Sequence, residues 1–271
     1  DVARFGDYAS PQYGTIKSSE NYERRFIMTF PNETLPKGRK QKTTALYDRF
    51  VNQGAVMGDS FGLENVLWFA NNKDDAHEEP TIKRSRSHDY VSKEVINVRE
   101  NVGLIEVANF SKHEFKGPDA RKFLDHIMAG RLPKPGRISL SPMLSYRGKL
   151  CGDLTVACLD ENEFMVFGSG AAQEMHRRWF ESHLDKFNLN YKNRSDEFHG
   201  LSIAGPNSRK VLEKIVRDDV SNEKFKFRDS RRMFVGGVPA LVNRISFTGE
   251  LGYEIYVAPH YQLKLYEELI E

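Results

Sequence analysis

Cysteine is scarce in this sequence, which has only two, Cys151 and Cys158, among its 271 residues. They do not form a C-x-x-C pair, so the usual spacing of a cysteine-based zinc or redox site is missing. If both lie on one strand, their odd separation directs them to opposite faces, which disfavours a disulfide. We therefore predict a reducing compartment and a cytoplasmic location.

An excess of charge of one sign and long apolar runs are also missing. Lysine and arginine total 40, aspartate and glutamate total 38, and the net charge is +2, which gives little support for nucleic-acid binding. No apolar run is long enough to span a bilayer. The chain starts at Asp1 without Met or the apolar core of a signal peptide, which suggests a fragment or a processed chain. We expect neither a nucleic-acid partner nor a membrane.

Several motifs of metal and cofactor sites do not occur. None of the eight histidines belongs to an H-x-x-E-H cluster, and no G-x-G-x-x-G opens a helix. No G-x-S-x-G nucleophile elbow is found. We therefore expect no metal site and no flavin site in this chain.

An internal repeat indicates the fold class. Residues 117–127 and 205–215 both read Gly-Pro-x-x-Arg-Lys-apolar-Leu-x-x-Ile, and each follows a strand-like segment, 110–116 or 198–204. Proline is favoured in the first turn of a helix, where its missing N–H costs nothing. Two strand–helix units of this kind are too few for a solenoid. They predict an α+β fold with two pseudo-symmetric strand–helix units.

The remaining periodicity completes this prediction. A helix with Met175, Trp179, Phe180 and Leu184 on its inner face is expected over 174–187. Sequential strands with helices on one side are typical of mostly antiparallel sheets. We expect 1–45 to be a linker or docking arm, 46–271 to be the main folded region and 71–93 to be a solvated insertion. Further strands are expected at 136–144, 150–159, 163–167 and in a hairpin at 234–242, and further helices at 20–30 and 261–270.

A run near the C-terminal end, residues 244–256, contains the first candidate site residue. Beyond Gly252 the pattern alternates, so Tyr253 and Ile255 face one way and Glu254 and Tyr256 the other. A buried carboxylate needs hydrogen-bond donors, so burial of Glu254 would require a reason. The alternative is a glycine-hinged hairpin with two surface glutamates.

Asp153 is the second candidate, in the expected strand that follows a turn at Gly148. Alternation places Asp153 on the same face as Thr155 and opposite to Leu154. The alternative is an aspartate that caps a turn or lies at a sheet edge.

The run Phe247-Thr248-Gly249-Glu250-Leu251-Gly252-Tyr253-Glu254 resembles the signature of the folate-binding aminomethyltransferase family, the T-proteins of glycine cleavage. The resemblance implies that Glu254 holds the amino-pyrimidine edge of tetrahydrofolate. A carboxylate suits this role because it accepts two hydrogen bonds from an N–H/NH2 pair. It also implies that Asp153, after Met143-Leu144, orients the folate and stabilises positive charge during one-carbon transfer.

Three further positions follow from the same resemblance, which implies folate contacts at Leu140, Phe247 and Tyr253. The family often has tyrosine where this chain has Leu140 and Phe247, and asparagine in the segment that here reads Phe167-Gly168-Ser169-Gly170. Gly152 replaces the first aspartate of the family's Asp-Asp pair. These departures remove hydroxyl and amide contacts to the folate.

The sequence resembles most closely the folate portion of dimethylglycine and sarcosine dehydrogenases, flavin enzymes with a T-protein-like C-terminal half. Residues 98–107 and Phe61-Gly62-Leu63-Glu64 also resemble family segments, and we expect Glu64 to be structural. We expect the family's C-terminal barrel to be absent from this chain. The junction motifs of these dehydrogenases are matched by Arg4-Phe5-Gly6, Pro36-x-Gly38-Arg39 and Gly54-Ala55-Val56.

The resemblance implies an aminomethyltransferase-like enzyme that uses tetrahydrofolate. It would accept the one-carbon unit released on N-demethylation of dimethylglycine or sarcosine and form methylene-tetrahydrofolate, with a flavoprotein oxidase segment or subunit as partner. Two alternatives stay open: a non-catalytic folate-binding or docking module, and a folate-dependent demethylase of a sulfonium substrate. Relatives in iron–sulfur cluster maturation carry a cysteine in the signature run, and this chain has none there.

Overall fold

The computed structural model describes residues 10–31 and 33–271, and the chain divides into two compact units, 1–97 and 98–271. The division falls within helix α3 (Ser87–Glu100). The expected boundary between residues 45 and 46 stays a prediction. The Arg4-Phe5-Gly6 motif lies outside the described residues.

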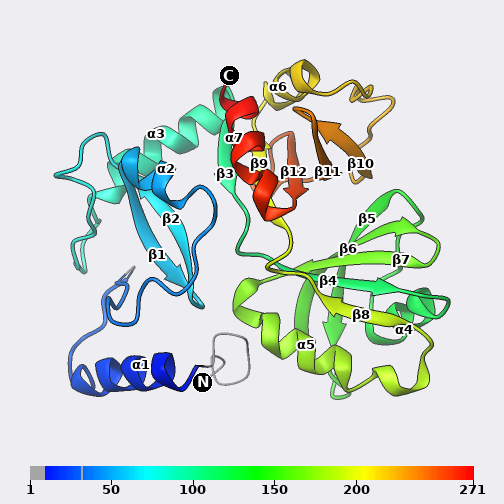
Figure 1. Ribbon diagram of the computed structural model, residues 1–271, viewed down its shortest axis with the longest axis horizontal. Helices are drawn as coiled ribbons and strands as arrows, with labels where there is room; N and C mark the ends of the chain where they lie inside the picture. Colours follow the sequence, from blue (N-terminus) through cyan, green and yellow to red (C-terminus); the bar gives the residue numbers. More distant parts are fainter. Residues whose placement is uncertain (1–9, 32) are drawn as a thin grey trace. The chain divides into compact units, whose positions relative to one another are not determined.

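In its described residues the first unit contains helices α1 and α2, a hairpin and most of α3, in blue and cyan in Figure 1. The helix expected over 20–30 was wrongly bounded: α1 begins at Pro11, because the Ser10 side chain accepts a hydrogen bond from the Tyr13 N–H at 3.0 Å and proline suits the first turn. Glu64 is buried and accepts a hydrogen bond from Arg39 Nε at 2.8 Å, which fits its expected structural role. The elements are α1 (Pro11–Glu23), α2 (Tyr47–Asn52), β1 (Ala55–Ser60) and β2 (Leu63–Phe69).

The second unit contains two five-stranded sheets in which every ladder is antiparallel, so the α+β prediction is confirmed. We call them the first and the second sheet. The first has the order β10 (Ser230–Val235), β11 (Val238–Asn243), β12 (Gly252–Val257), β9 (His199–Ala204) and β3 (Gly103–Glu106). The second has the order β5 (Arg137–Leu144), β6 (Leu150–Asp160), β7 (Glu163–Gly168), β4 (Ser111–Lys116) and β8 (Asn190–Asn193).

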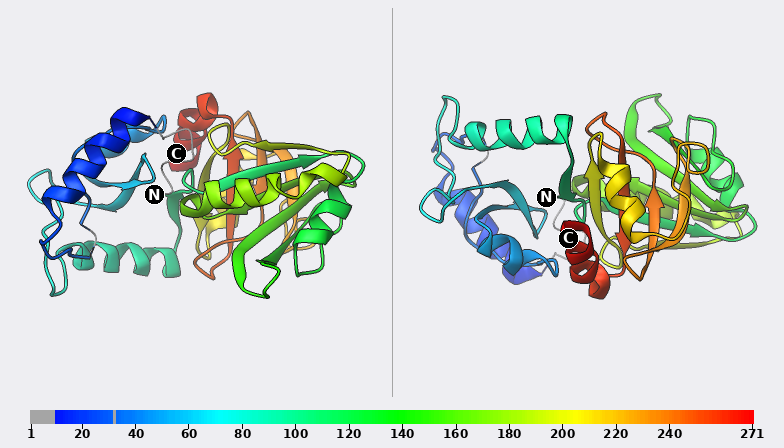
Figure 2. Two further views of the ribbon diagram at one scale, coloured as in Figure 1. Left: turned by 90° about the horizontal axis from the view of Figure 1, so that it is seen from below. Right: turned by 90° about the horizontal axis from the view of Figure 1, so that it is seen from above.

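Helices cover these sheets, as Figures 1 and 2 show. Helices α6 and α7 lie beside the first sheet, and α4 and α5 beside the second. The expected elements at 136–144, 150–159, 163–167 and 261–270 are present within a residue or two, and the hairpin expected at 234–242 is present but its first strand begins four residues earlier, at Ser230. The helices are α4 (Ala120–Ile127), α5 (Gln173–Glu181), α6 (Ser208–Ile215) and α7 (Gln262–Ile270).

The repeat appears as the units β4–α4 and β9–α6. Each turn has a glycine with positive φ, 139° at Gly117 and 129° at Gly205. A Cβ on Gly205 would lie 2.4 Å from the Asn101 carbonyl oxygen, so glycine is required there on two grounds. The prediction that proline lies inside each helix was wrong, because Asp119 and Asn207 are the N-caps and the prolines precede them.

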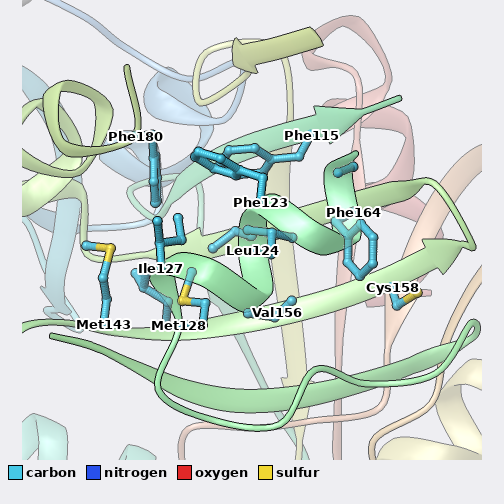
Figure 3. Packing of buried hydrophobic residues seen from close by; sticks show 13 residues of the cluster. Phe115, Phe123, Leu124, Ile127, Met128, Met143, Val156, Cys158, Phe164 and Phe180 are labelled. Atoms are coloured by element: carbon cyan, nitrogen blue, oxygen red, sulfur yellow. The ribbon is translucent and has the colours of Figure 1, made fainter. Parts of the chain in front are cut away.

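A large apolar cluster lies between the second sheet and its helices. Figure 3 shows Phe123, Leu124 and Ile127 of α4 above strand residues that include Val156 and Phe164. These side chains share one face of α4 because they recur at helical spacing.

The helix expected over 174–187 ends sooner, at Glu181, and its inner face differs from the prediction. Phe180 is buried, but Met175 is 50% exposed, while His176 is 2% exposed. The prediction preferred apolar residues and therefore missed a buried histidine beside them.

Both cysteines lie on β6 and are free. The prediction that they face opposite sides was wrong. Both pack against the apolar cluster between the second sheet and its helices. A register shift occurs where Leu144 pairs with Leu150 and Met143 with Gly152, so Cys151 departs from the alternation.

Candidate functional site

Four side chains form a row on the face of the second sheet that points to the first. Leu140 pairs with Thr155, Thr155 with Phe167, and Phe167 with Lys112. Paired residues of an antiparallel ladder point to the same face, so the row runs across β5, β6, β7 and β4. Asp153 lies two residues from Thr155 on this face and pairs with Pro142. Asp153 is exposed, and Leu140 is 61% exposed.

The opposing face of the first sheet carries Glu254 and Tyr256. The two sheets contact each other here: the Tyr256 ring stacks on Phe167 with centroids 4.6 Å apart. Ala157 of β6, on the Asp153 face, belongs to the same buried cluster as Tyr256. The structure therefore brings the candidate faces of β6 and β12 together, which alternation within each strand could not predict.

Glu254 is a buried carboxylate with one side-chain donor, since the Tyr256 hydroxyl donates to its Oε2 at 2.9 Å. Burial raises the pKa of Glu254 to about 7, against the opposing effects of this hydrogen bond and of the charge on Lys112. Asn243 pairs directly with Glu254 and is fully buried, and its Nδ2 has no hydrogen-bond partner among the described residues. A carboxylate beside an unpaired amide donor is suited to a polar ligand edge.

The loop between β11 and β12 carries Phe247, which is 96% exposed. The loop closes on itself: the Ser246 hydroxyl donates to the Glu250 carbonyl, and the Glu250 N–H donates to Thr248 Oγ1 at 3.2 Å. A Cβ on Gly252 would lie 2.6 Å from Ser246 Cβ, so glycine allows this close approach.

Tyr253 is a predicted site residue that the structure places away from this group. It is fully buried on the other face of β12, where its ring stacks on Phe225 at 5.9 Å and its hydroxyl accepts a hydrogen bond from Arg209 Nε at 3.2 Å. The strand alternation that turns Glu254 inward turns Tyr253 outward to the helix side.

His176 of α5 contacts β6 near the strand's first residues. Its Nε2 donates to the Cys151 carbonyl at 3.2 Å, two residues before Asp153. A Cβ on Gly152 would lie 2.8 Å from this Nε2, so glycine lets the strand approach the ring. Burial lowers the pKa of His176, which favours the neutral ring.

Lys112 is the main polar residue that the sequence reasoning missed. It is fully buried, and its Nζ donates to the Ala108 carbonyl at 2.7 Å. Burial lowers its pKa to about 7. The sequence offered only a weak signal, a lysine at an inward position of an expected strand.

Two observations bear on other kinds of site. Within residues 10–31 and 33–271, no group of three or more His, Cys, Asp or Glu side chains could hold a metal ion. In the same described ranges no helix is long and apolar enough to cross a membrane. Separately, a cavity of about 520 Å³ has Tyr256 in its lining but not Glu254. Its lining also includes Leu159, Met165, Phe198 and Leu241.

Comparison with known proteins identifies the family. A family model described as "GCVT N-terminal domain" matches residues 46–271, and one described as "FAD dependent oxidoreductase central domain" matches residues 1–44. The chain therefore belongs to the aminomethyltransferase (GCVT) family, as the signature run predicted.

Two curated relatives place the chain within longer proteins. Dimethylglycine dehydrogenase, mitochondrial, of Homo sapiens is 33% identical over 274 residues, which cover 100% of this chain and 31% of that protein. The aminomethyltransferase of Thermotoga sp. (strain RQ2) is 26% identical and is matched over 84% of this chain and 58% of its own length. The chain thus spans less than a third of the dehydrogenase.

Two solved structures confirm the fold. Aminomethyltransferase T of the glycine cleavage system from Bartonella henselae superposes with a TM-score of 0.70 at 22% identity, over 85% of this chain and 57% of that one. A chain of the heterotetrameric sarcosine oxidase from Corynebacterium sp. U-96 gives 0.52 at 19% identity, over 70% and 94%. The T-protein-like fold expected from the sequence is confirmed.

Proposed function

We propose that this chain binds tetrahydrofolate between its two sheets and accepts a one-carbon unit from a methylated amine, with methylene-tetrahydrofolate as product. The observation that carries the proposal is the buried carboxylate of Glu254 facing the strand that bears Asp153. Membership of the aminomethyltransferase family supports it. The cytoplasmic location stays a prediction.

Glu254 would hold the amino-pyrimidine edge of the folate. Its surroundings fit such a group, because a charge-assisted pair of hydrogen bonds to the ligand would compensate a carboxylate whose one side-chain donor among the described residues is Tyr256. Asn243 Nδ2, unpaired among the described residues, is a further donor for a polar ring edge. Leu140 and Phe247 are large exposed apolar side chains that would cover the flat faces of the ligand.

Asp153 would act beside the reacting atoms. Tetrahydrofolate would supply the amine nitrogens that accept the one-carbon unit. The Asp153 carboxylate would orient this acceptor and stabilise the positive charge of an iminium-like donor. His176 would keep Asp153 in place through its hydrogen bond to the Cys151 carbonyl.

The amine would be dimethylglycine or sarcosine, oxidised by a flavoprotein. The match of residues 1–44 to a flavin oxidoreductase domain and the 33% identity to dimethylglycine dehydrogenase support this assignment. Mixing this chain with a flavin-dependent dimethylglycine dehydrogenase and tetrahydrofolate should raise the yield of methylene-tetrahydrofolate. An unchanged yield would contradict the assignment of the amine.

The binding step is tested by anaerobic calorimetric titration with tetrahydrofolate. We expect micromolar binding that weakens about tenfold to a hundredfold in Glu254→Ala, because a charge-assisted hydrogen bond is lost. Glu250→Ala, in the loop before β12, is the matched control and should bind as the wild type does. Failure of the folded wild-type protein to bind would contradict the proposal.

The chemical step is tested with Asp153→Asn. Loss of the carboxylate should lower kcat about a hundredfold while folate affinity is kept, because its charge acts on the transition state. Asp160→Asn, at the other end of β6, is the control. Full turnover by Asp153→Asn would contradict the catalytic role of Asp153, whereas absence of turnover in the wild type would favour the non-catalytic docking module.

A further inference from the structure

A fully buried lysine beside the candidate folate site requires an explanation. Lys112 lies on β4, in the interior of the second sheet, and is 0% exposed. Moving an ammonium group out of water is costly unless other charges compensate it. The Ala108 carbonyl, at 2.7 Å from Nζ, is a neutral acceptor and compensates only part of this cost.

Three carboxylates oppose the effect of burial on the pKa of Lys112, in decreasing order of effect those of Asp196, Glu106 and Glu254. Asp196 follows β8 and is exposed. Glu106 of β3 accepts a hydrogen bond from Gln262 of α7. Glu254 differs from both, because it is buried on the face of the first sheet that opposes Lys112.

Tyr256 lies between the lysine and Glu254. Lys112 Nζ is 5.9 Å from the centroid of its ring, and the hydroxyl of the same ring donates to Glu254 Oε2 at 2.9 Å. Phe167, the direct strand partner of Lys112, stacks on this ring at 4.6 Å and fixes its position. Ser202 of β9 and Asn243 of β11, the residues paired with Glu254, carry no charge.

We propose that Lys112 is a positioning residue, which keeps Glu254 ionised and thereby ready to accept the two hydrogen bonds of a folate-type amino-pyrimidine edge. This inference rests on the proposed function and adds to it the electrostatic partner of the binding carboxylate. Lys112 acts through the field across Tyr256 and contacts no ligand atom. A protonated Glu254 would lose acceptor capacity and bind the same edge poorly.

The pH dependence follows from the signs of these effects. Burial raises the pKa of Glu254 to about 7, and the positive charge of Lys112 opposes this rise. The ionised carboxylate, and with it binding, is therefore lost as pH falls through this value. The pKa of Lys112 is itself lowered to about 7, so the lysine carries its charge in the acid range where Glu254 takes up a proton. Without that charge the pKa of Glu254 rises further, so binding is lost at a higher pH.

The first test follows Glu254 directly, without folate, by 13C NMR of carboxyl-labelled glutamate, with the resonance assigned by its loss in Glu254→Gln. Lys112→Met should move the midpoint of Glu254 up by about one pH unit. Lys116→Met, which removes an exposed lysine from the same strand, should leave it in place. An unchanged midpoint in Lys112→Met would overturn the proposal.

Because Lys112→Met could fail to fold, the reciprocal measurement keeps the lysine. In Glu254→Gln the pKa of Lys112, followed by the 13Cε shift of labelled lysine, should fall below its wild-type value, since the coupling acts equally on both groups. A Lys112 pKa that does not change would overturn the proposal by itself.

The second test measures tetrahydrofolate binding between pH 6 and pH 8. In Lys112→Met the affinity should decline from a pH about one unit higher than in the wild type, about a tenfold loss at the acid end. The same pH profile in Lys112→Met and wild type would overturn the role in binding. If the NMR midpoint moves but the wild-type protein binds no folate, the coupling holds and the proposed function fails.

Discussion

Tyr256 makes two contacts at the site: its ring stacks on Phe167 of the second sheet, and its hydroxyl donates to Glu254 of its own strand. Alternation in the sequence placed Glu254 and Tyr256 on one face, and the structure agrees. Sequence could not reveal the burial of Lys112, because that depends on its pairing with Phe167 from a distant strand. At the scale of single residues, local periodicity therefore predicts which way a side chain points, but its contacts with residues of distant strands can be seen only in the structure.

Gly152 offers a test at this scale. In Gly152→Ala the new Cβ would lie 2.8 Å from His176 Nε2 and 3.4 Å from Leu154 Cγ, so the strand or the ring must move. We expect a loss of about 1–3 kcal/mol in the free energy of unfolding, measured by urea titration. Gly14→Ala in α1, where no atom lies within 4 Å of the new Cβ, should be neutral or slightly stabilising. An unchanged stability of Gly152→Ala would contradict the close approach.

His113 provides a prediction on pH. It is fully buried, its Nδ1 forms a hydrogen bond with the Tyr191 hydroxyl at 2.9 Å, and burial lowers its pKa to about 3. An unfolded histidine binds a proton near pH 6.5, so below that pH the unfolded state gains protons that the folded state does not. The contribution to stability should therefore fall by about 1.4 kcal/mol per pH unit from 6.5 towards the folded value. The free energy of unfolding, measured by urea titration at several pH values, should depend less steeply on pH in His113→Gln than in the wild type. Equal pH dependence in the two proteins would contradict this.

At the scale of elements, the two glycine–proline turns show what sequence could and could not predict. The repeated motif correctly predicted β4–α4 and β9–α6, because strand and helix periodicity are local. The position of proline was wrong, since Asp119 and Asn207 cap the helices one residue later. The predicted bounds of α1 were also wrong, because the prediction did not use Ser10 as an N-cap in this charged segment. The pairing of β12 with β9, and so the position of Glu254 in the first sheet, needed the structure.

Substitution of Gly205 tests the second of these turns. Gly205→Ala would combine a φ of 129° with a Cβ only 2.4 Å from the Asn101 carbonyl oxygen. We expect a loss of about 3 kcal/mol or more in the free energy of unfolding. Gly237→Ala has positive φ but no atom within 4 Å, so it should lose only about 1–2 kcal/mol. Equal losses would show that backbone conformation alone, and not the close approach, requires glycine at 205.

At the scale of the whole molecule, the second unit carries every residue of the proposed site, from Lys112 and Asp153 to Glu254. The chain spans 31% of the human dimethylglycine dehydrogenase that it resembles, so the amine and the flavin partner are matters for experiment. The fold class and the family were predicted from sequence, because a signature run carries more information than periodicity. The proposed electrostatic coupling between Lys112 and Glu254 could not be predicted from the sequence, because it depends on two sheets that pack face to face.

The most direct measurement is a crystal structure of the protein with tetrahydrofolate bound. Our account predicts the amino-pyrimidine edge against the Glu254 carboxylate, with Asp153 facing the reactive nitrogens. Density for the ligand in the cavity of about 520 Å³ that is lined by Tyr256 but not by Glu254 would contradict the account.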